Sequence, residues 1–189
     1  HSILIHRLSS WFGLNGSVLS WLQSYISSRE FVVSINASLS DPLPLHQGVP
    51  QGSVLGPLLF ILYTTPISSL ISNSSIKHHL YADDTQLFIS FLPSVYSSSI
   101  NLLQSSISQV STWMSANLLS LNPSKTECLI FGNSIQLAKL TNPVLHIDNA
   151  TVIQPTATAR NLGILFDNHL SFDNQISSVC RSCNWHIHD

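Results

Sequence analysis

The chain has 189 residues, of which 44% are hydrophobic and only 8% are charged. This composition fits one domain with a sizeable core or two small lobes, and it excludes a disordered chain, which would combine low hydrophobicity with high net charge. Seven basic and nine acidic residues give a net charge of −2, and the basic residues form no run. We therefore expect only weak binding of nucleic acid by these residues alone, because phosphate binding usually needs a basic face.

The first part of the chain predicts two helices, a pair of strands and a third helix. Apolar residues recur at helical intervals between residues 3 and 26, and Gly13 with Asn15-Gly16 interrupts them, so we expect two helices joined by a turn. Residues 29–36 favour a strand, with 42–46 as its partner. Pro57 predicts the start of a helix over 57–70.

The segment from Val54 to Ile71 carries no charged residue, so it allows a second interpretation as a membrane span. Pro57 and Pro66 and the hydroxyl residues between 64 and 69 favour a buried core helix instead. We therefore expect no membrane association.

The rest of the chain predicts a hairpin, a long helix and a series of short strands. Residues 76–81 and 85–91 favour two strands of a hairpin, and apolar spacings of three and four predict a helix over 97–116. Four further strands are expected at 125–131, 144–147, 151–153 and 161–166, and a last helix at 171–187. Helices and antiparallel strands without strict alternation predict the α+β class.

Asp83 and Asp84 are the only adjacent acidic residues, and the predicted hairpin places them at or beside its tip. Paired carboxylates suit a site that holds two divalent cations about 4 Å apart and transfers phosphoryl groups. Because neighbouring strand residues point to opposite faces, we expect Asp83 to bind metal and Asp84 to play a secondary role. An ordinary acidic turn is the alternative, since aspartate favours turns.

A glycine-rich segment, residues 48–57, precedes the predicted helix at 57–70. Its glycines would allow a ligand to approach the backbone closely, and Gln51 offers a donor and acceptors, which suits a nucleotide and its sugar. A tight turn into the helix is the alternative. Together with Tyr81-Ala82-Asp83-Asp84, in this order and spacing, the segment forms a specific combination.

These motifs resemble the reverse transcriptases of non-long-terminal-repeat (LINE-type) retrotransposons. Four segments carry the resemblance: residues 18–31 before the nucleotide loop, the loop and helix from Gly48 to Phe60, the segment from Leu121 to Glu127, and the stretch from Leu162 to Asp167. The resemblance implies a right-hand polymerase palm, an antiparallel sheet backed by helices, that is incomplete at the N-terminus. The palm would occupy residues 1–131, and residues 132–189 would hold the palm-to-thumb connection with a truncated thumb helix.

The resemblance also implies a function for individual residues. The catalytic residues would be Asp83, Asp84 and Lys125, with Asp83 and Asp84 binding Mg²⁺ or Mn²⁺ (two ions in a complete site) and Lys125 acting near the pyrophosphate as a general acid or by balancing charge. The nucleotide pocket would be lined by Pro50, Gln51, Gly52 and Tyr81. Leu162 and Gly163 would belong to the hairpin that grips the primer end. The partners would be an RNA template, a DNA primer and a dNTP.

The sequence departs from the family at both ends. The family places its first metal-binding aspartate a few residues before the equivalent of His1, and the chain stops partway through an expected thumb helix. We therefore expect little or no polymerase activity from these 189 residues alone, because both metals would lose a shared ligand. Two alternatives stay open: a non-catalytic module that binds a partner by strand addition, and a decayed reading frame without a stable fold. If expressed, the chain is expected inside the cell, in the cytoplasm or nucleus.

Cysteine and histidine residues near the C-terminus suggest one further interpretation. Cys180 and Cys183 are followed by His186 and His188, which allows a zinc site. Residues that share a helix face by coincidence are the alternative that we favour. With Cys128 the chain has only three cysteines, which argues against a disulfide scaffold.

Overall fold

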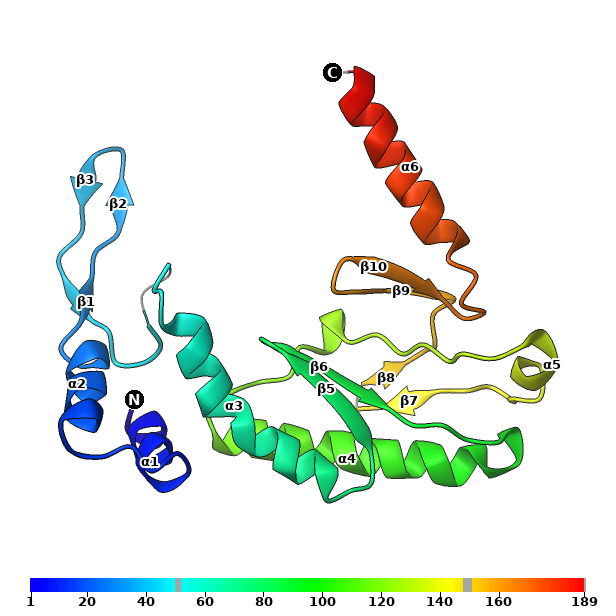
Figure 1. The fold of residues 1–189 in the computed structure, drawn as a ribbon, viewed down its shortest axis with the longest axis horizontal. Helices are drawn as coiled ribbons and strands as arrows, with labels where there is room; N and C mark the ends of the chain where they lie inside the picture. Colours follow the sequence, from blue (N-terminus) through cyan, green and yellow to red (C-terminus); the bar gives the residue numbers. More distant parts are fainter. Residues whose placement is uncertain (50–51, 148–150, 189) are drawn as a thin grey trace. The chain divides into compact units, whose positions relative to one another are not determined.

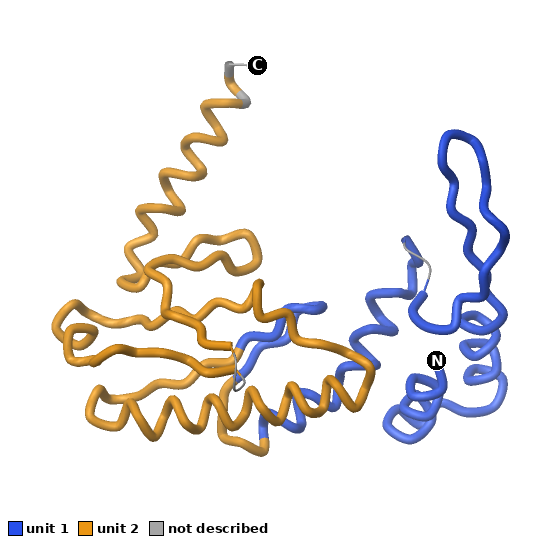
Figure 2. The backbone as a smooth tube through the Cα atoms, turned by 180° about the vertical axis from the view of Figure 1, so that it is seen from behind, with its two compact units in different colours: residues 1–72, 78–86 blue, residues 73–77, 87–189 orange. Residues whose placement is uncertain are grey.

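The computed structural model describes residues 1–49, 52–147 and 151–188, with the side chains of 186 and 188 excepted. The chain divides into two compact units, His1–Ser72 with His78–Gln86 and Asn73–Lys77 with Leu87–Asp189 (Figure 2). These units are defined by their internal packing and are described separately below. The boundary predicted at residue 131, between the palm and the palm-to-thumb connection, stays a prediction.

The first unit begins with two short helices, α1 (Ser2–Ser10) and α2 (Gly16–Ile26), which confirms the predicted break between them. The third helix, α3 (Gly56–Ser72), includes the whole predicted range 57–70. Leu4 and Leu8 of α1, Ile26 of α2 and Leu59 of α3 are buried against one another. The core of this unit is therefore built from one apolar face of each helix.

Helix α3 is also buried over its second half, where Ile67 and Ile71 are each 1% exposed. Its proline at position 66 is buried within the helix, and the Thr64 hydroxyl donates to the carbonyl of Phe60. The preference for a buried core helix is thus confirmed. Among the described residues, none of the helices has the length and apolar character needed to cross a membrane.

A two-stranded ribbon connects α2 to the glycine-rich segment (Figure 1). At the base of the ribbon, β1 (Glu30–Phe31) pairs with β4 (Leu43–Pro44). At its end, β2 (Ser34–Ile35) pairs with β3 (Ser38–Leu39), and both pairs are antiparallel. The predicted partnership of 29–36 with 42–46 is confirmed at β1 and β4, but the first strand is interrupted. The reason is local: the Ser40 hydroxyl accepts the N–H of Val33 and takes the place of a backbone partner.

The predicted hairpin around the paired aspartates is present as β5 (Lys77–Tyr81) and β6 (Asp84–Phe88). Figure 1 shows the two strands side by side. Only Ala82 and Asp83 lie between them, so the turn has two residues.

The second unit is organised around the long helix α4 (Tyr96–Ala116), which follows a 3₁₀ turn η1 (Pro93–Val95). Ile107 of α4 is buried with Leu145 and Ile147, and Leu103 packs against this cluster. Val110 and Met114 of the predicted apolar stripe are buried as well. The helix predicted at 97–116 is confirmed.

The strand predicted at 125–131 is wrong. The chain forms a 3₁₀ turn η2 (Pro123–Lys125) and then meets its neighbours at separate points. The Cys128 carbonyl accepts the N–H of Thr156 at 2.9 Å, and the Gly132 N–H donates to Asn168 at 3.0 Å. Because these partners lie twelve residues apart in the sequence, no continuous ladder forms, and only a single bridge joins Leu129 to Thr156.

The remaining elements are two hairpins and two helices. Strands β7 (Leu145–His146) and β8 (Val152–Ile153) pair near the core, and β9 (Thr158–Asn161) pairs with β10 (Ile164–Asp167). The strand predicted at 161–166 is therefore confirmed only over 164–166, within β10, because a turn at Leu162-Gly163 divides the predicted range. The short helix α5 (Ser134–Leu137) was not predicted, whereas α6 (Asp173–His188) confirms the last helix.

The fold class predicted from the sequence, α+β, is confirmed. The described residues pair their strands in five two-stranded sheets, and the pairs β1–β4, β2–β3, β7–β8 and β9–β10 are antiparallel. A polymerase palm sheet is implied only by the family described below.

Candidate functional site

The paired aspartates lie at the end of the β5–β6 hairpin. Asp83 occupies the two-residue turn and Asp84 is the first residue of β6, and both are exposed. Ala82 has a φ of 51°, in the left-handed region that few non-glycine residues adopt. The turn therefore presents two adjacent carboxylates to solvent, with Tyr81 (59% exposed) at the end of the preceding strand.

The strand that leads to this turn is attached to helix α3. His78 Nε2 lies 2.8 Å from the hydroxyl of Ser68, and both side chains are half-buried. The next residue of the strand, His79, is exposed. One histidine thus holds the hairpin on the helix, while its neighbour on the opposite strand face contacts solvent.

The glycine-rich segment is held at both of its described ends. Pro50 and Gln51, two of the residues expected to line a nucleotide pocket, lie outside the described residues, whereas Gly52 is described and exposed. His1 Nε2 lies 2.7 Å from the carbonyl oxygen of Gly48, and the hydroxyl groups of Tyr25 and Ser53 are hydrogen-bonded. These contacts connect the segment to α1 and α2.

Gly56 marks the close passage of the segment into helix α3. A Cβ atom at this position would meet a methyl group of Val49 at 3.3 Å, which is tighter than ordinary van der Waals contact. A side chain here would require Val49 to shift by a few tenths of an ångström. The glycine therefore fits a close packing contact and does not by itself indicate a ligand.

Helix α3 is fixed further along by an arginine from α1. The Arg7 guanidinium donates to the carbonyl of Tyr63 and lies 4.9 Å from the centre of the Tyr63 ring. Burial lowers the pKa of Arg7 and raises the pKa of the Tyr63 hydroxyl, and each group partly opposes the shift of the other. The planar guanidinium suits this double role, because it donates in its plane and stacks on its face.

The other predicted site residues lie in the second unit. Lys125 is exposed at the end of η2, and Leu162 and Gly163 form the exposed turn between β9 and β10 with φ values of 46° and 86°. Positive φ at both turn positions gives a tight two-residue connection that matches the twist of the strands. The Glu127 carboxylate accepts the backbone N–H of Arg160 at 3.3 Å and so connects the segment after Lys125 to this hairpin.

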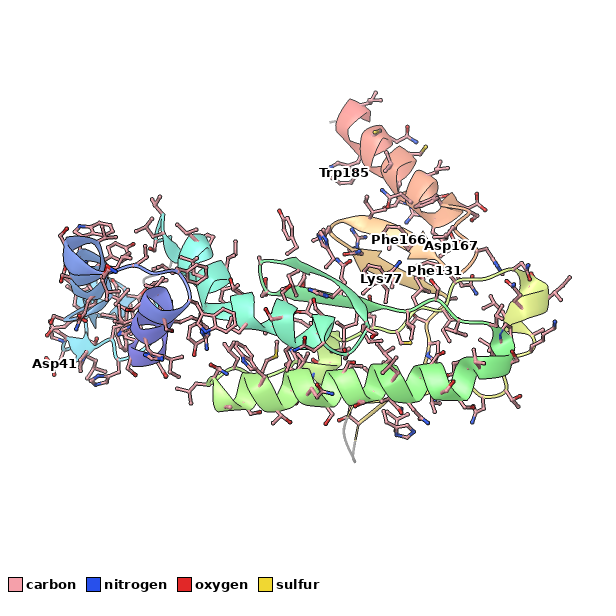
Figure 3. All side chains as sticks on the ribbon, turned by 60° about the horizontal axis from the view of Figure 1, so that its bottom comes forward. Asp41, Lys77, Phe131, Phe166, Asp167 and Trp185 are labelled. Atoms are coloured by element: carbon pink, nitrogen blue, oxygen red, sulfur yellow. The ribbon has the colours of Figure 1, made fainter. Side chains whose placement is uncertain are left out.

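Asp167 joins the β9–β10 hairpin to helix α6. Its carboxylate accepts the backbone N–H groups of His169, Ser171 and Phe172 at 2.7 to 3.0 Å, and the Ser171 hydroxyl at 3.2 Å. The backbone hydrogen bond from Ser171 is the main cause that lowers the pKa of Asp167, against the effect of burial. Figure 3 shows Asp167 beside Phe166 and Phe131, whose rings meet edge to face at 6.5 Å.

Comparison with known proteins decides the family. The family model "Reverse transcriptase (RNA-dependent DNA polymerase)" matches residues 1–166. This chain belongs to the reverse transcriptase family. The paired aspartates, the glycine-rich segment and the β9–β10 turn all lie within the matched range.

Individual relatives agree with this assignment. The chain is 32% identical over 167 residues to "Probable RNA-directed DNA polymerase from transposon BS" and 31% identical over 162 residues to "Probable RNA-directed DNA polymerase from transposon X-element", both of Drosophila melanogaster. The matches cover 86% and 84% of this chain but only 18% and 17% of the relatives. It is also 25% identical over 187 residues, 96% of this chain and 19% of the relative, to "RNA-directed DNA polymerase from mobile element jockey" of Drosophila funebris.

These matches confirm the predicted resemblance to reverse transcriptases of LINE-type retrotransposons. The chain spans less than a fifth of the length of the curated relatives it matches. No solved structure matches it significantly.

Two of the four side chains in the zinc interpretation lie outside the described part of the structure. Cys180 and Cys183 are exposed free thiols on α6, and the side chains of His186 and His188 lie outside the described part. Within the described residues, no group of three or more histidine, cysteine or acidic side chains could hold a metal ion. The paired aspartates supply two carboxylates, and among the described residues no third such side chain completes a group with them.

The structure brings Gly52, Tyr81, Asp83 and Asp84 into the first unit, and Lys125, Leu162 and Gly163 into the second. The supporting contacts, from Tyr25, Ser68, His78 and Glu127, were not predicted. Each joins residues at least ten positions apart, so no local sequence signal marks it.

Proposed function

We propose that this chain is part of an RNA-directed DNA polymerase that adds nucleotides from dNTPs to a DNA primer on an RNA template. The observation that carries the proposal is the β5–β6 turn, which presents Asp83 and Asp84 to solvent in a chain of the reverse transcriptase family. One carboxylate lies on the turn and the other on the first residue of β6. Both are exposed, so they are accessible to a ligand.

The donor set suits Mg²⁺ or Mn²⁺, which are hard cations that bind carboxylate oxygens. Asp83 would be a ligand and Asp84 would play a secondary role beside it. In a complete site, two such ions stabilise the attacking and leaving oxygens of the transferred phosphoryl group. The contribution of this chain is to hold the two carboxylates on a short, supported turn.

The remaining residues would orient the substrates. Pro50, Gln51, Gly52 and Tyr81 would line the nucleotide pocket, where the Tyr81 ring is exposed for contact. Lys125, whose ammonium group is exposed, would lie near the pyrophosphate and balance its charge or donate a proton. Leu162 and Gly163 would contact the primer end from the tip of the β9–β10 turn.

A polypeptide of only these 189 residues should have little or no polymerase activity. Two cations about 4 Å apart need carboxylates that bridge them, and the family supplies one such aspartate from a strand before the equivalent of His1. The few basic residues should also make its binding to primer-template weak and steeply dependent on salt.

Primer extension tests the proposal. The 189-residue polypeptide and a longer form that includes the preceding strand would be compared on an RNA template with a DNA primer, dNTPs and Mg²⁺ or Mn²⁺, each with and without Asp83→Ala. We expect extension only by the longer form, and its loss in Asp83→Ala. Extension by the longer form that survives Asp83→Ala would contradict the role of this turn. Extension by the short form that Asp83→Ala abolishes would contradict only the expected inactivity.

A further inference from the structure

The hydrogen bond between Ser68 and His78 connects the two motif-bearing elements of the first unit. Helix α3 begins at Gly56, at the end of the glycine-rich segment, and β5 ends at Tyr81, directly before the Ala82-Asp83 turn. Ser68 lies near the end of α3 and His78 lies near the start of β5. The 2.8 Å contact is therefore a side-chain connection between the helix and the strand that carries the aspartates.

Support from helix α3 matters for the hairpin because the residues at its tip are not buried. Asp83 and Asp84 are exposed, and Ala82 holds an unfavourable positive φ. Helix α3 is held firmly around Ser68, since the nearby residues Ile67 and Ile71 are each 1% exposed. A ligand set binds metal more strongly when its support is rigid before binding.

We propose that Ser68 and His78 are positioning residues, whose hydrogen bond fixes β5 on helix α3 and thereby holds Asp83 in the geometry that binds a divalent cation. This inference rests on the proposed function of Asp83. Neither Ser68 nor His78 contacts the metal or a substrate in this scheme. The two residues act through the strand between His78 and Tyr81.

The chain offers matched controls for both partners. Ser69 is the exposed neighbour of Ser68 on the same helix, and His79 is the exposed neighbour of His78 on the opposite strand face. Ser69→Ala and His79→Leu therefore make the same chemical changes one residue away. Ser68→Ala should fold, because alanine is the most favourable residue inside a helix.

The test measures binding of Mn²⁺ to the longer form that includes the preceding strand, by the electron paramagnetic resonance signal of the free ion, with the melting temperature recorded for each variant. We expect Ser68→Ala and His78→Leu to weaken binding about three- to tenfold, as expected when one hydrogen bond is lost. The double variant should bind no more weakly than either single variant. His78→Gln, which keeps a polar nitrogen near the position of Nε2, should restore most of the affinity.

The outcomes separate this inference from the proposed function. A lower melting temperature with unchanged Mn²⁺ affinity in Ser68→Ala would overturn the positioning role and leave a purely structural hydrogen bond. Equal weakening by the two control substitutions would also overturn it. Unchanged Mn²⁺ affinity in Asp83→Asn would instead show that Asp83 is not a metal ligand. Both the proposed function of Asp83 and the positioning role of Ser68 and His78 would then be contradicted. If His78→Leu does not fold, Ser68→Ala and His78→Gln decide the question.

Discussion

Replacing Leu8 with alanine tests whether the three helices of the first unit share one core. The Leu8 side chain is completely buried and packs with Ile26 of α2 and Leu59 of α3. Removing three carbon atoms from such a site costs about 2–5 kcal/mol, which includes the transfer of the lost atoms and the cavity that they leave. Because α1 has only nine residues and can shift to fill part of the space, we expect about 3 kcal/mol.

This loss should appear in urea unfolding followed by circular dichroism. A single domain is typically stable by about 5–15 kcal/mol, so a loss of this size lowers the unfolding midpoint clearly. Leu145→Ala makes the same change in the core of the second unit, where Leu145 is 4% exposed. If the two units unfold separately, Leu8→Ala should lower one transition and Leu145→Ala the other.

An exposed leucine provides the control. Leu118 is 77% exposed, so Leu118→Ala should change the unfolding free energy by less than about 0.5 kcal/mol. An effect of Leu8→Ala as small as that of Leu118→Ala would refute the packing of α1 against α2 and α3. The attachment of α3 to α1 through Arg7 would then need to be reconsidered as well.

Three further predictions concern the surface and the second unit. The pKa of Asp167 is lower in the folded chain than in the unfolded chain, where it is about 4, so the ionised carboxylate stabilises the fold above that pH. This stability is lost as pH falls through the folded pKa. The difference in melting temperature between the parent and Asp167→Asn should therefore shrink from pH 7 to pH 3. Ile35→Lys, at a ribbon position that is 66% exposed, should raise solubility in a precipitation assay without lowering the melting temperature. Cys180 and Cys183 should react quickly with a thiol reagent, whereas Cys128, whose pKa is raised by burial, should react slowly until urea is added.

The helices were predictable because their signals are local. Gly13 and Asn15-Gly16 separate α1 from α2, Pro57 opens α3, and regular apolar spacing marks α4. The strands were less predictable, since a strand exists only where a partner runs beside it. The apolar segment after Lys125 has the composition of a strand, but its hydrogen-bond partners are Thr156 and Asn168, which lie too far apart to form a ladder.

The turn at Leu162 shows a second limit of sequence reasoning. Leucine rarely adopts a positive φ, so Leu162-Gly163 inside the apolar stretch 161–166 resembles the middle of a strand. The paired aspartates gave a clearer signal, because acidic residues favour turns and β-favouring residues flank them on both sides. The hairpin at the candidate site was therefore predicted, whereas the contacts that support it were not.

In the first unit, the residues proposed to bind metal differ from the residues that support the fold around them. Asp83 is exposed, so Asp83→Ala should leave the unfolding free energy unchanged within error while it removes binding of Mn²⁺. The Tyr25 hydroxyl is hydrogen-bonded to the Ser53 hydroxyl of the glycine-rich segment. Tyr25→Phe removes this hydrogen bond and should lower the unfolding free energy by about 1 kcal/mol. Both variants can be measured by urea unfolding and by Mn²⁺ titration. A large loss of stability in Asp83→Ala would show that the turn depends on its carboxylate, and the separation between support and chemistry would not hold.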